Sequence, residues 1–224
     1  ACPPAPARYA PPMCNLYALT AGQAAIRELA GAMADAAGNL PSQPAIYPDA
    51  SAAIIRTGAE GRLLARARWG LPSPAFALEG KSADRGITNV RNTASPHWRR
   101  WLGPAHRCLV PFTAFSEYGP GPDGRKQPMW FALGPDQPLA FFAGLWCSWQ
   151  GTRKASEGPI STDLFAFLTC PPNAEVAAIH PKAMPVILTT PAEWTLWLEA
   201  PWAEAATLQR PLSDGALQLV PAPA

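Results

Sequence analysis

The sequence is poor in the residues that bind metal ions. It has three histidines, which are not clustered: His97, His106 and His180. It has five cysteines, none in a CxxC pair: Cys2, Cys14, Cys108, Cys147 and Cys170. Structural zinc sites need four such ligands at short, regular spacings. We therefore expect no metal and no other cofactor, and the odd number of cysteines favours reduced thiols in the cytoplasm.

Long apolar runs are also missing. No stretch approaches the roughly 20 apolar residues that a helix needs to cross a bilayer, and residues 1–12 lack the apolar core of a signal peptide. Hydrophobic residues make up 48% of the chain and charged residues 15%, as in globular proteins. We expect no contact with a membrane. We interpret residues 1–12, rich in Ala and Pro, as a flexible leader that is absent from the active protein, ahead of one domain over 13–224.

Acidic residues are absent between Asp84 and Glu117. That span contains five arginines and two tryptophans: Arg85, Arg91, Arg99, Arg100, Arg107, Trp98 and Trp101. Basic residues interleaved with aromatic ones suit a phosphate backbone and stacked bases. The alternative is a solvated basic surface over buried tryptophans, and the net charge of only +2 does not decide between them.

Short strand patterns separated by turns run through the chain. Strands are predicted at 13–19, 87–91, 108–110, 113–118, 129–133, 139–149, 163–170, 184–188 and 217–220, and a hairpin at 52–56 and 62–69. Helices are predicted at 21–37, 95–101, 173–179, from 190 onwards and at 203–209, with capping boxes at Thr20–Gln23 and Thr190–Glu193. Twenty-eight prolines favour short elements. The expected fold is α+β, a single domain with a barrel-like, mostly antiparallel β core and short flanking helices.

Met13-Cys14 opens the first segment with a foldable pattern. If translation begins at Met13, removal of that Met makes Cys14 the first residue of the chain. An N-terminal Cys carries a free amine and a thiol on adjacent carbons, a pair that no internal residue offers. The alternative is an inert Cys at the start of a buried strand.

Several polar residues stand in apolar surroundings. Asn89 and Arg91 lie within Thr-Asn-Val-Arg-Asn-Thr, Glu117 ends an apolar strand pattern, and His180 precedes a proline. A carboxyl group in an apolar strand has a raised pKa unless it is paired, which suits general acid/base catalysis. A His held beside a proline suits proton transfer. Each residue alone fits a structural role equally well.

Several motifs in order resemble the SOS response-associated peptidase (SRAP) family, which shields abasic sites in single-stranded DNA. The resemblance runs from Met13 to about Val220. It rests on Met13-Cys14, Arg68-Trp69-Gly70-Leu71-Pro72, Asn89-Val90-Arg91, Arg107-Cys108-Leu109-Val110-Pro111, Phe115-Ser116-Glu117-Tyr118 and Ile179-His180-Pro181-Lys182-Ala183-Met184-Pro185-Val186.

The resemblance implies a covalent crosslink between Cys14 and the ring-opened aldehyde of an abasic deoxyribose. It implies that Cys14 is the nucleophile, Asn89 positions the sugar and the Cys, and Glu117 and His180 act as acid and base. Arg91 is implied as a phosphate contact, and Thr169 and Lys182 as further DNA contacts. Arg99 and Arg100, from the acid-free span, join them as expected DNA-binding residues. The implied protein is bacterial, cytoplasmic and monomeric, and associates with the nucleoid when bound to DNA.

The chemistry follows from the residue types. An α-amine has a pKa of about 8, so part of it is neutral at pH 7 and attacks an aldehyde. The neighbouring thiol then closes on the imine carbon to give a thiazolidine. The same imine permits β-elimination, an AP-lyase side activity.

The sequence departs from the family pattern at three places. Asn15-Leu16 replaces the usual Gly-Arg, Asn92-Thr93 replaces an acidic residue, and a tryptophan pair is missing, so that Phe76 is the expected base-stacking wedge. The leader also blocks the amine of Cys14, and we expect either a start at Met13 or proteolytic removal, by the protein itself or by another protease.

Two other functions fit parts of the sequence. One is a cysteine peptidase that acts only on its own propeptide. The other is a non-catalytic module that binds single-stranded DNA. The acid-free span argues against the first, and Glu117 and His180 in apolar surroundings argue against the second.

Overall fold

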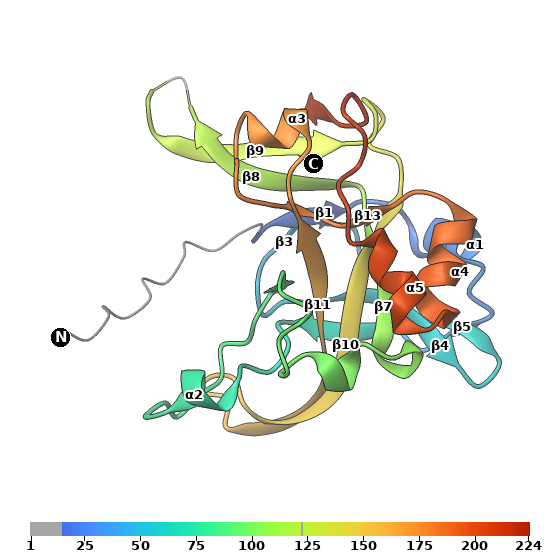
Figure 1. Ribbon diagram of the computed structural model, residues 1–224, viewed down its shortest axis with the longest axis vertical. Coiled ribbons are helices and arrows are strands. Elements are labelled where there is room, and N and C mark those ends of the chain that lie inside the picture. The colour runs from blue at the N-terminus through green and yellow to red at the C-terminus, as the bar shows by residue number, and fades with distance from the viewer. Residues whose placement is uncertain (1–14, 122) are drawn as a thin grey trace.

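Five long strands close into a barrel (Figure 1). The computed structural model describes residues 15–121 and 123–224. The barrel strands are β4 (Ser51–Gly58), β5 (Gly61–Trp69), β7 (Arg107–Phe112), β10 (Ala140–Thr152) and β11 (Pro159–Cys170). They pair in the order β5-β4-β7-β10-β11, and a parallel pairing of β11 with β5 closes the ring. All other pairings in the ring are antiparallel, which confirms the predicted α+β, barrel-like fold.

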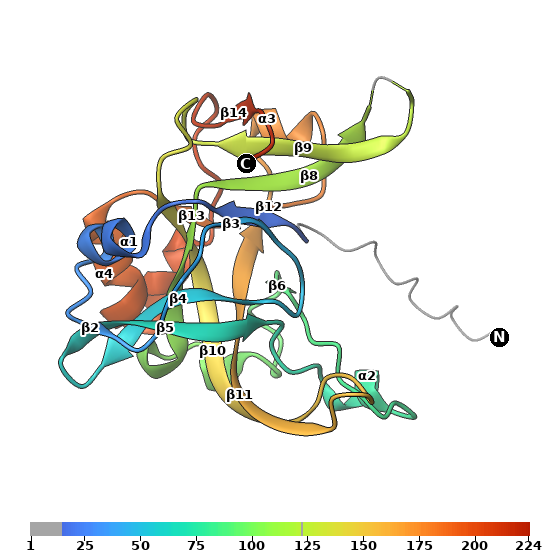
Figure 2. The same ribbon diagram turned by 180° about the vertical axis from the view of Figure 1, so that it is seen from behind.

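A second sheet covers one end of the barrel. Its order is β14 (Gln218–Val220), β9 (Lys126–Ala132), β8 (Ala114–Pro120), β1 (Tyr17–Leu19) and β3 (Gln43–Ile46). Figure 2 shows it above the barrel from behind, with the β8–β9 hairpin extending beyond the body. Short strands extend the barrel sheet: β2 (Ala34–Asp35), β6 (Asn89–Val90), β12 (Met184–Pro185) and β13 (Ile187–Leu188).

The helices are short and lie outside the sheets. They are α1 (Gln23–Ala30), α2 (Ala75–Leu78), α3 (Ala174–Ala177), α4 (Pro191–Glu199) and α5 (Trp202–Ala205), with 3-10 turns η1 (Arg99–Trp101), η2 (Pro104–His106) and η3 (Ala206–Leu208). In Figure 1, α1, α4 and α5 lie together on one side of the barrel and α2 lies on the other. Within the described residues, none of these helices is long and apolar enough to cross a membrane.

Aromatic rings join β1 to the barrel. Tyr17 is fully buried, and its ring meets Trp69 edge-on at 5.1 Å, Phe142 at 5.8 Å and Phe167 at 6.0 Å between centroids. Such edge-to-face pairs stabilise a core by about 0.5–1.5 kcal/mol each beyond the area they bury. The first described strand is therefore fixed against β5, β10 and β11.

The predicted helix at 21–37 is wrong in its length. α1 ends at Ala30 because Gly31 adopts a left-handed conformation (φ 60°) and its N–H bonds the carbonyls of Arg27 and Glu28. The predicted capping box at Thr20 also does not form, because the Thr20 hydroxyl lies 3.2 Å from that of Thr113. Gln23 instead accepts a hydrogen bond from the N–H of Leu40.

Most other predicted elements are confirmed with changes at their ends, but the predicted strand at 184–188 divides into β12, which pairs with β11, and β13, which pairs with β10, and the predicted helix at 203–209 divides into α5 and η3. The hairpin is β4–β5, and the capping box at Thr190 and Glu193 forms in full at the start of α4. The predicted helix at 95–101 reduces to a turn followed by η1, and its tryptophans Trp98 and Trp101 are buried rather than free to stack on bases. Residues 13 and 14 of the first predicted strand, and the whole leader, lie outside the described residues.

Candidate active site and nucleic-acid interface

Glu117 and His180 form a close pair. The Nδ1 atom of His180 lies 2.9 Å from Oε2 of Glu117, and their side chains are 18% and 5% exposed. Glu117 lies in β8, whereas His180 follows α3 and donates its backbone N–H to the carbonyl of Val176 at 2.7 Å. The structure thus brings together two predicted catalytic residues that are 63 positions apart in the sequence.

The surroundings of His180 favour its neutral form. Burial lowers the pKa of the imidazole, and the charges of Lys182 and Lys126 lower it further. When the neutral imidazole carries its proton on Nδ1, the atom that lies 2.9 Å from Oε2 of Glu117, Nε2 is left as a proton acceptor. The lowered pKa also makes the protonated form a stronger acid. The pair therefore combines a buried carboxylate with an imidazole whose protonated form gives up its proton readily.

The described chain begins beside this pair. In the antiparallel pairing of β1 with β8, Tyr17 lies opposite Phe115, and the N–H of Ser116 bonds the carbonyl of Leu16 at 3.0 Å. Continuing this register by two residues puts Asn15 opposite Glu117. Cys14, the predicted nucleophile, lies outside the described residues, and the residue that follows it enters the fold next to the acid/base pair.

Asn89 approaches β1 from the barrel. It lies in β6, which pairs in parallel with β11 so that Asn89 is opposite Phe167. Phe167 in turn packs edge-on against Tyr17 of β1. The half-buried Asn89 side chain donates from Nδ2 to the hydroxyl of Thr88 at 3.0 Å. Asn89 therefore lies beside the residue whose ring contacts β1.

Arg91 holds two chain segments together. Its Nη1 donates to the carbonyl of Cys170 at 3.1 Å and to that of Lys182 at 2.9 Å. These bonds tie the end of β11 to the loop that carries His180. One nitrogen of the guanidinium is thus engaged inside the protein, and its role as a phosphate contact stays a prediction.

Thr169 and Lys182 differ in exposure. Thr169 is fully buried in β11, and its hydroxyl has no hydrogen-bond partner among the described residues. A buried polar atom without a partner is uncommon in native proteins. Lys182 is exposed two positions after His180. A direct DNA contact by Thr169 would need a ligand that reaches into the fold.

The remaining predicted DNA-binding residues lie away from the pair. Phe76 projects from α2 and is 77% exposed, as a base-stacking residue requires. Arg99 and Arg100 are exposed on η1, which packs against β10. The guanidinium of Arg100 covers the ring of Trp101 at 4.4 Å and lies 3.3 Å from His97. The structure does not bring Arg99 and Arg100 to Glu117 and His180.

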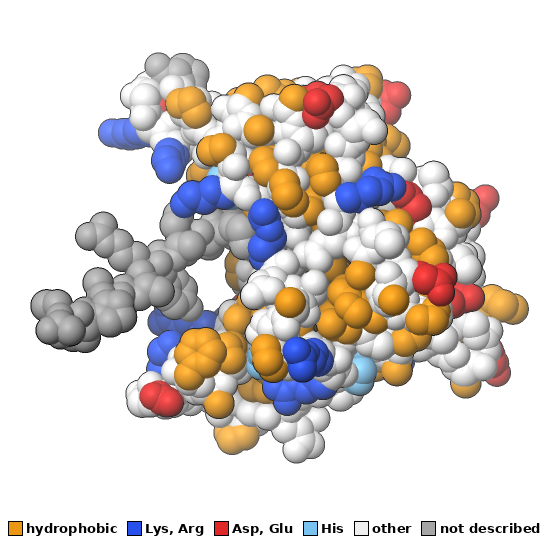
Figure 3. Space-filling model, viewed as in Figure 1, with side chains coloured by type: hydrophobic (Ala, Val, Ile, Leu, Met, Phe, Trp, Pro, Cys, Tyr) orange, Lys and Arg blue, Asp and Glu red, His pale blue; other side chains and the backbone are white. Residues whose placement is uncertain are grey.

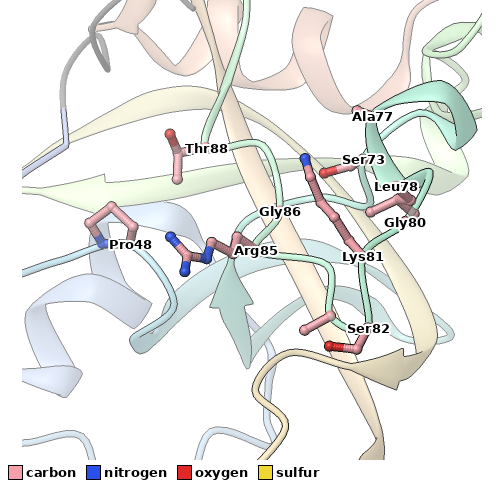
Figure 4. A pocket seen from close by; sticks show the side chains of 11 residues that line it. Pro48, Ser73, Ala77, Leu78, Gly80, Lys81, Ser82, Arg85, Gly86 and Thr88 are labelled. Atoms are coloured by element: carbon pink, nitrogen blue, oxygen red, sulfur yellow. The ribbon is translucent and has the colours of Figure 1, made fainter.

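A basic pocket beside Asn89 was not predicted from the sequence. It has a volume of about 720 Å³ and lies between α2, the loop after it and Pro48. Figure 4 shows Lys81 and Arg85 projecting into it from that loop, with Thr88 at one edge. Because Thr88 accepts the hydrogen bond of Asn89, the pocket adjoins the candidate site. Its only signal in the sequence was the presence of Lys81 and Arg85 in a loop with two glycines, Gly80 and Gly86.

Buried charges hold the wall of this pocket. The Asp84 carboxylate accepts hydrogen bonds from the hydroxyl of Ser73 at 2.6 Å and from the N–H of Gly86 at 2.8 Å. Arg153, 3% exposed, donates to the backbone carbonyls of Asp84 and Gly70. Gly86 has φ 76°, and a Cβ there would overlap the Arg153 guanidinium. These buried contacts therefore fix the conformation of the loop that forms the wall of the pocket.

The charge on the surface is uneven (Figure 3). Lys and Arg side chains gather on the left part of this view, from the β8–β9 hairpin down to the region of α2. Asp and Glu lie mainly on the right part, over α1, α4 and α5.

The described part of the chain has no group of three or more metal-binding side chains. Its cysteines are buried, and burial raises the pKa of Cys147 and of Cys170 to about 12 and that of Cys108 further. These thiols are protonated at neutral pH and are poor nucleophiles. Any reactive cysteine must lie in residues 1–14.

Comparisons with known proteins agree with this description. No curated protein matches the sequence. A crystal structure of a protein from Bacteroides thetaiotaomicron has a TM-score of 0.73 and 22% identity, covering 92% of this chain and 90% of that one. A phage-related protein from Bordetella bronchiseptica has a TM-score of 0.64 and 23% identity, covering 92% of each chain. Both show the fold alone.

The family model for SOS response associated peptidase (SRAP) matches residues 13–223, almost the whole chain. The match begins at Met13, and its range contains each motif on which the resemblance rests. The chain therefore belongs to the SOS response associated peptidase family, a membership that supports a role related to the SOS response and to association with abasic sites.

Proposed function

We propose that the protein binds abasic sites in single-stranded DNA and forms a covalent thiazolidine crosslink through an N-terminal Cys14. The observation that carries this proposal is the Glu117–His180 pair, 2.9 Å apart, at the point where the chain after Cys14 enters β1. A proton-exchanging pair beside the N-terminus suits chemistry of an α-amine. Family membership supports the abasic site as its substrate.

The crosslink forms with loss of one water. In its protonated form, His180 donates a proton to the ring oxygen of the deoxyribose as the C1–O bond breaks, and it takes back the proton that the C1 hydroxyl releases as the C1 aldehyde forms. The neutral amine of Cys14 attacks that carbon, and the carbinolamine loses water to give an imine. The thiol sulfur then adds to the imine carbon, and its proton passes through Glu117 to the nitrogen. The product is a five-membered ring that resists hydrolysis better than the imine.

The other site residues position the strand. Asn89 orients the sugar toward Cys14, and Arg91 and Lys182 contact neighbouring phosphates. Lys81 and Arg85 extend this basic surface along the pocket, and Phe76 stacks on a base at its rim. Thr169 contributes to DNA binding through its buried hydroxyl. Binding raises the effective concentration of the aldehyde at Cys14.

Arg99 and Arg100 have a separate part in this proposal. They contact phosphates farther along the strand, because they lie away from the pair. Replacing them should weaken DNA binding without changing the rate at which bound DNA forms the adduct. We propose that the protein acts as a monomer in the bacterial cytoplasm.

The amine of Cys14 must be free for this reaction. Translation from Met13 followed by removal of Met, or cleavage of residues 1–13 by the protein itself or by another protease, would expose it. Self-cleavage is the peptidase activity that the proposal includes, and β-elimination from the imine is its lyase side activity.

The test uses protein expressed from Met13, with loss of Met13 verified by mass spectrometry. It is incubated with a single-stranded oligonucleotide that contains one abasic site and analysed on a denaturing gel. We expect a heat-stable adduct that requires the abasic site and is lost in Cys14→Ala. Undamaged DNA is the matched control. Binding without an adduct would identify a non-catalytic DNA-binding module. Full-length protein that cleaves its leader but neither binds nor crosslinks DNA would identify a peptidase.

A further inference from the structure

The C-terminal segment from Gln209 to Gly215 contacts both halves of the candidate site. Gln209 follows η3, and its side chain makes three hydrogen bonds. Nε2 donates to the carbonyl of Arg91 at 2.8 Å and to that of Thr169 at 3.0 Å, and Oε1 lies 3.0 Å from the hydroxyl of Thr93. Both amide hydrogens are thus used. This one side chain joins the end of β6, the end of β11 and the loop after Arg91.

The same segment holds the start of α3. The Asp214 carboxylate accepts the N–H of Ala174, the first residue of α3, at 2.8 Å. Glu175 in α3 accepts the N–H of Gly215. A carboxylate at a helix N-terminus satisfies an amide that has no partner within the helix. α3 leads directly into His180, so these bonds fix the approach of that residue to Glu117.

Figure 1 shows how this connection is possible. The red C-terminal segment leaves α5, passes the upper end of β11 and rises beside the second sheet to β14, which Figure 2 labels next to α3. It therefore runs from the barrel side of the site, which carries Asn89 and Thr169, to the sheet side, which carries Glu117.

We propose that Gln209 and Asp214 are positioning residues that set the spacing between the Asn89 and Thr169 side of the site and the Glu117–His180 pair. This inference rests on the proposed function. Neither residue touches the reacting atoms; Gln209 acts through the backbone of Arg91 and Thr169, and Asp214 acts through α3. A misplacement of about 1 Å in a reacting group costs up to about 100-fold in rate, so the loss of such contacts is measurable.

The first test reads the geometry without any reaction. The chain has three histidines, so the ring signals of His180 are separable from those of His97 and His106 by NMR. In Asp214→Ala we expect the titration of His180 to move, and the ring signals of His97 and His106 serve as internal references. Asp214→Asn keeps an oxygen acceptor for Ala174 and should restore the wild-type titration. An unchanged His180 in Asp214→Ala would overturn the role of Asp214, whether or not the protein forms crosslinks.

The second test separates positioning from binding. Gln209→Leu keeps the size of the side chain and removes its three hydrogen bonds. At saturating abasic DNA we expect adduct formation about 10-fold to 100-fold slower, with affinity for undamaged single-stranded DNA unchanged. Gln43→Leu, which removes one amide–carbonyl bond in β3, is the matched control and should react at the wild-type rate. A wild-type rate in folded Gln209→Leu would overturn the inference, whereas no adduct with the wild-type protein would overturn the proposed function instead.

Discussion

Gly119 lies so close beneath Ile179 that no side chain fits between them. A Cβ at Gly119 would lie 2.8 Å from Cγ2 of Ile179 and 2.9 Å from Cγ of Met129. Gly119 is two residues beyond Glu117 in β8, and Ile179 immediately precedes His180. The missing side chain therefore allows the loop after α3 to rest on β8, which brings the imidazole to the carboxylate.

Replacing Gly119 by Ala should push this loop away from β8. Overpacking of this kind costs about 1–3 kcal/mol in the free energy of unfolding, and adduct formation should fall more than stability alone explains. Urea unfolding and the crosslinking rate measure the two effects. Gly103→Ala is the control, because a Cβ there meets nothing within 4 Å and φ is −74°. Full crosslinking activity in Gly119→Ala would show that the close approach is not needed.

The pKa of His180 predicts how stability depends on pH. Burial and the nearby lysines lower this pKa below its ordinary value of 6.5, so the unfolded chain binds a proton more readily than the folded protein. The free energy of unfolding should therefore fall as the pH drops below about 6.5 and level off below the folded-state pKa. His180→Gln should remove this contribution. Identical pH profiles of the two proteins in urea unfolding would contradict the shift.

Local patterns predicted most of the strands because alternation and turn residues act over a few positions. They failed where a contact with a residue far away in the sequence determines the local structure. Thr20–Gln23 and Thr190–Glu193 have the same capping pattern, yet only the second forms a box, since the Thr20 hydroxyl bonds Thr113, which is 93 positions away. A single sequence gives no sign of that contact.

The site shows the same limit. Glu117 and His180 were each predicted, but their distance follows from the stacking of a loop on β8. Gln209 was missed because its three partners come from segments that only the fold brings together. The basic pocket was missed because the loop that presents Lys81 and Arg85 is shaped by Asp84 and by a distant arginine.

Arg153 should be essential for the shape of that pocket. It is buried, with burial lowering its pKa, and it donates to the carbonyls of Gly70 and Asp84. Arg153→Met keeps the volume but leaves Asp84 buried without its cation, at a cost of about 3–5 kcal/mol. Hydrogen exchange should also accelerate in residues 70–86. The control is Arg125→Met, at a side chain that is 90% exposed, which should change the free energy of unfolding by less than about 0.5 kcal/mol. An equally small effect of Arg153→Met would show that Arg153 does not hold the wall of the pocket.

Thiol labelling should distinguish Cys14 from the buried cysteines. In protein that starts at Met13, brief treatment with iodoacetamide at neutral pH should modify Cys14 alone, because Cys108, Cys147 and Cys170 are buried with raised pKa values. Peptide mass spectrometry locates the label. Labelling in denaturant, where all four thiols react, is the positive control. Rapid native labelling of Cys147 or Cys170 would mean that β10 or β11 is more open than the structure shows.

Lys81 and Arg85 should contribute to the salt dependence of DNA binding. Each phosphate contact on a single strand adds about 0.7 to the slope of log affinity against log salt, through release of counterions. Lys81→Ala and Arg85→Ala should each weaken binding of undamaged single-stranded DNA and reduce that slope by about 0.7. Fluorescence anisotropy over a range of salt concentrations measures both quantities. Arg27→Ala on α1, on the opposite side of the barrel, removes the same charge outside the proposed interface. Equal effects at Arg27 and Arg85 would mean that net charge, and not the pocket, determines binding.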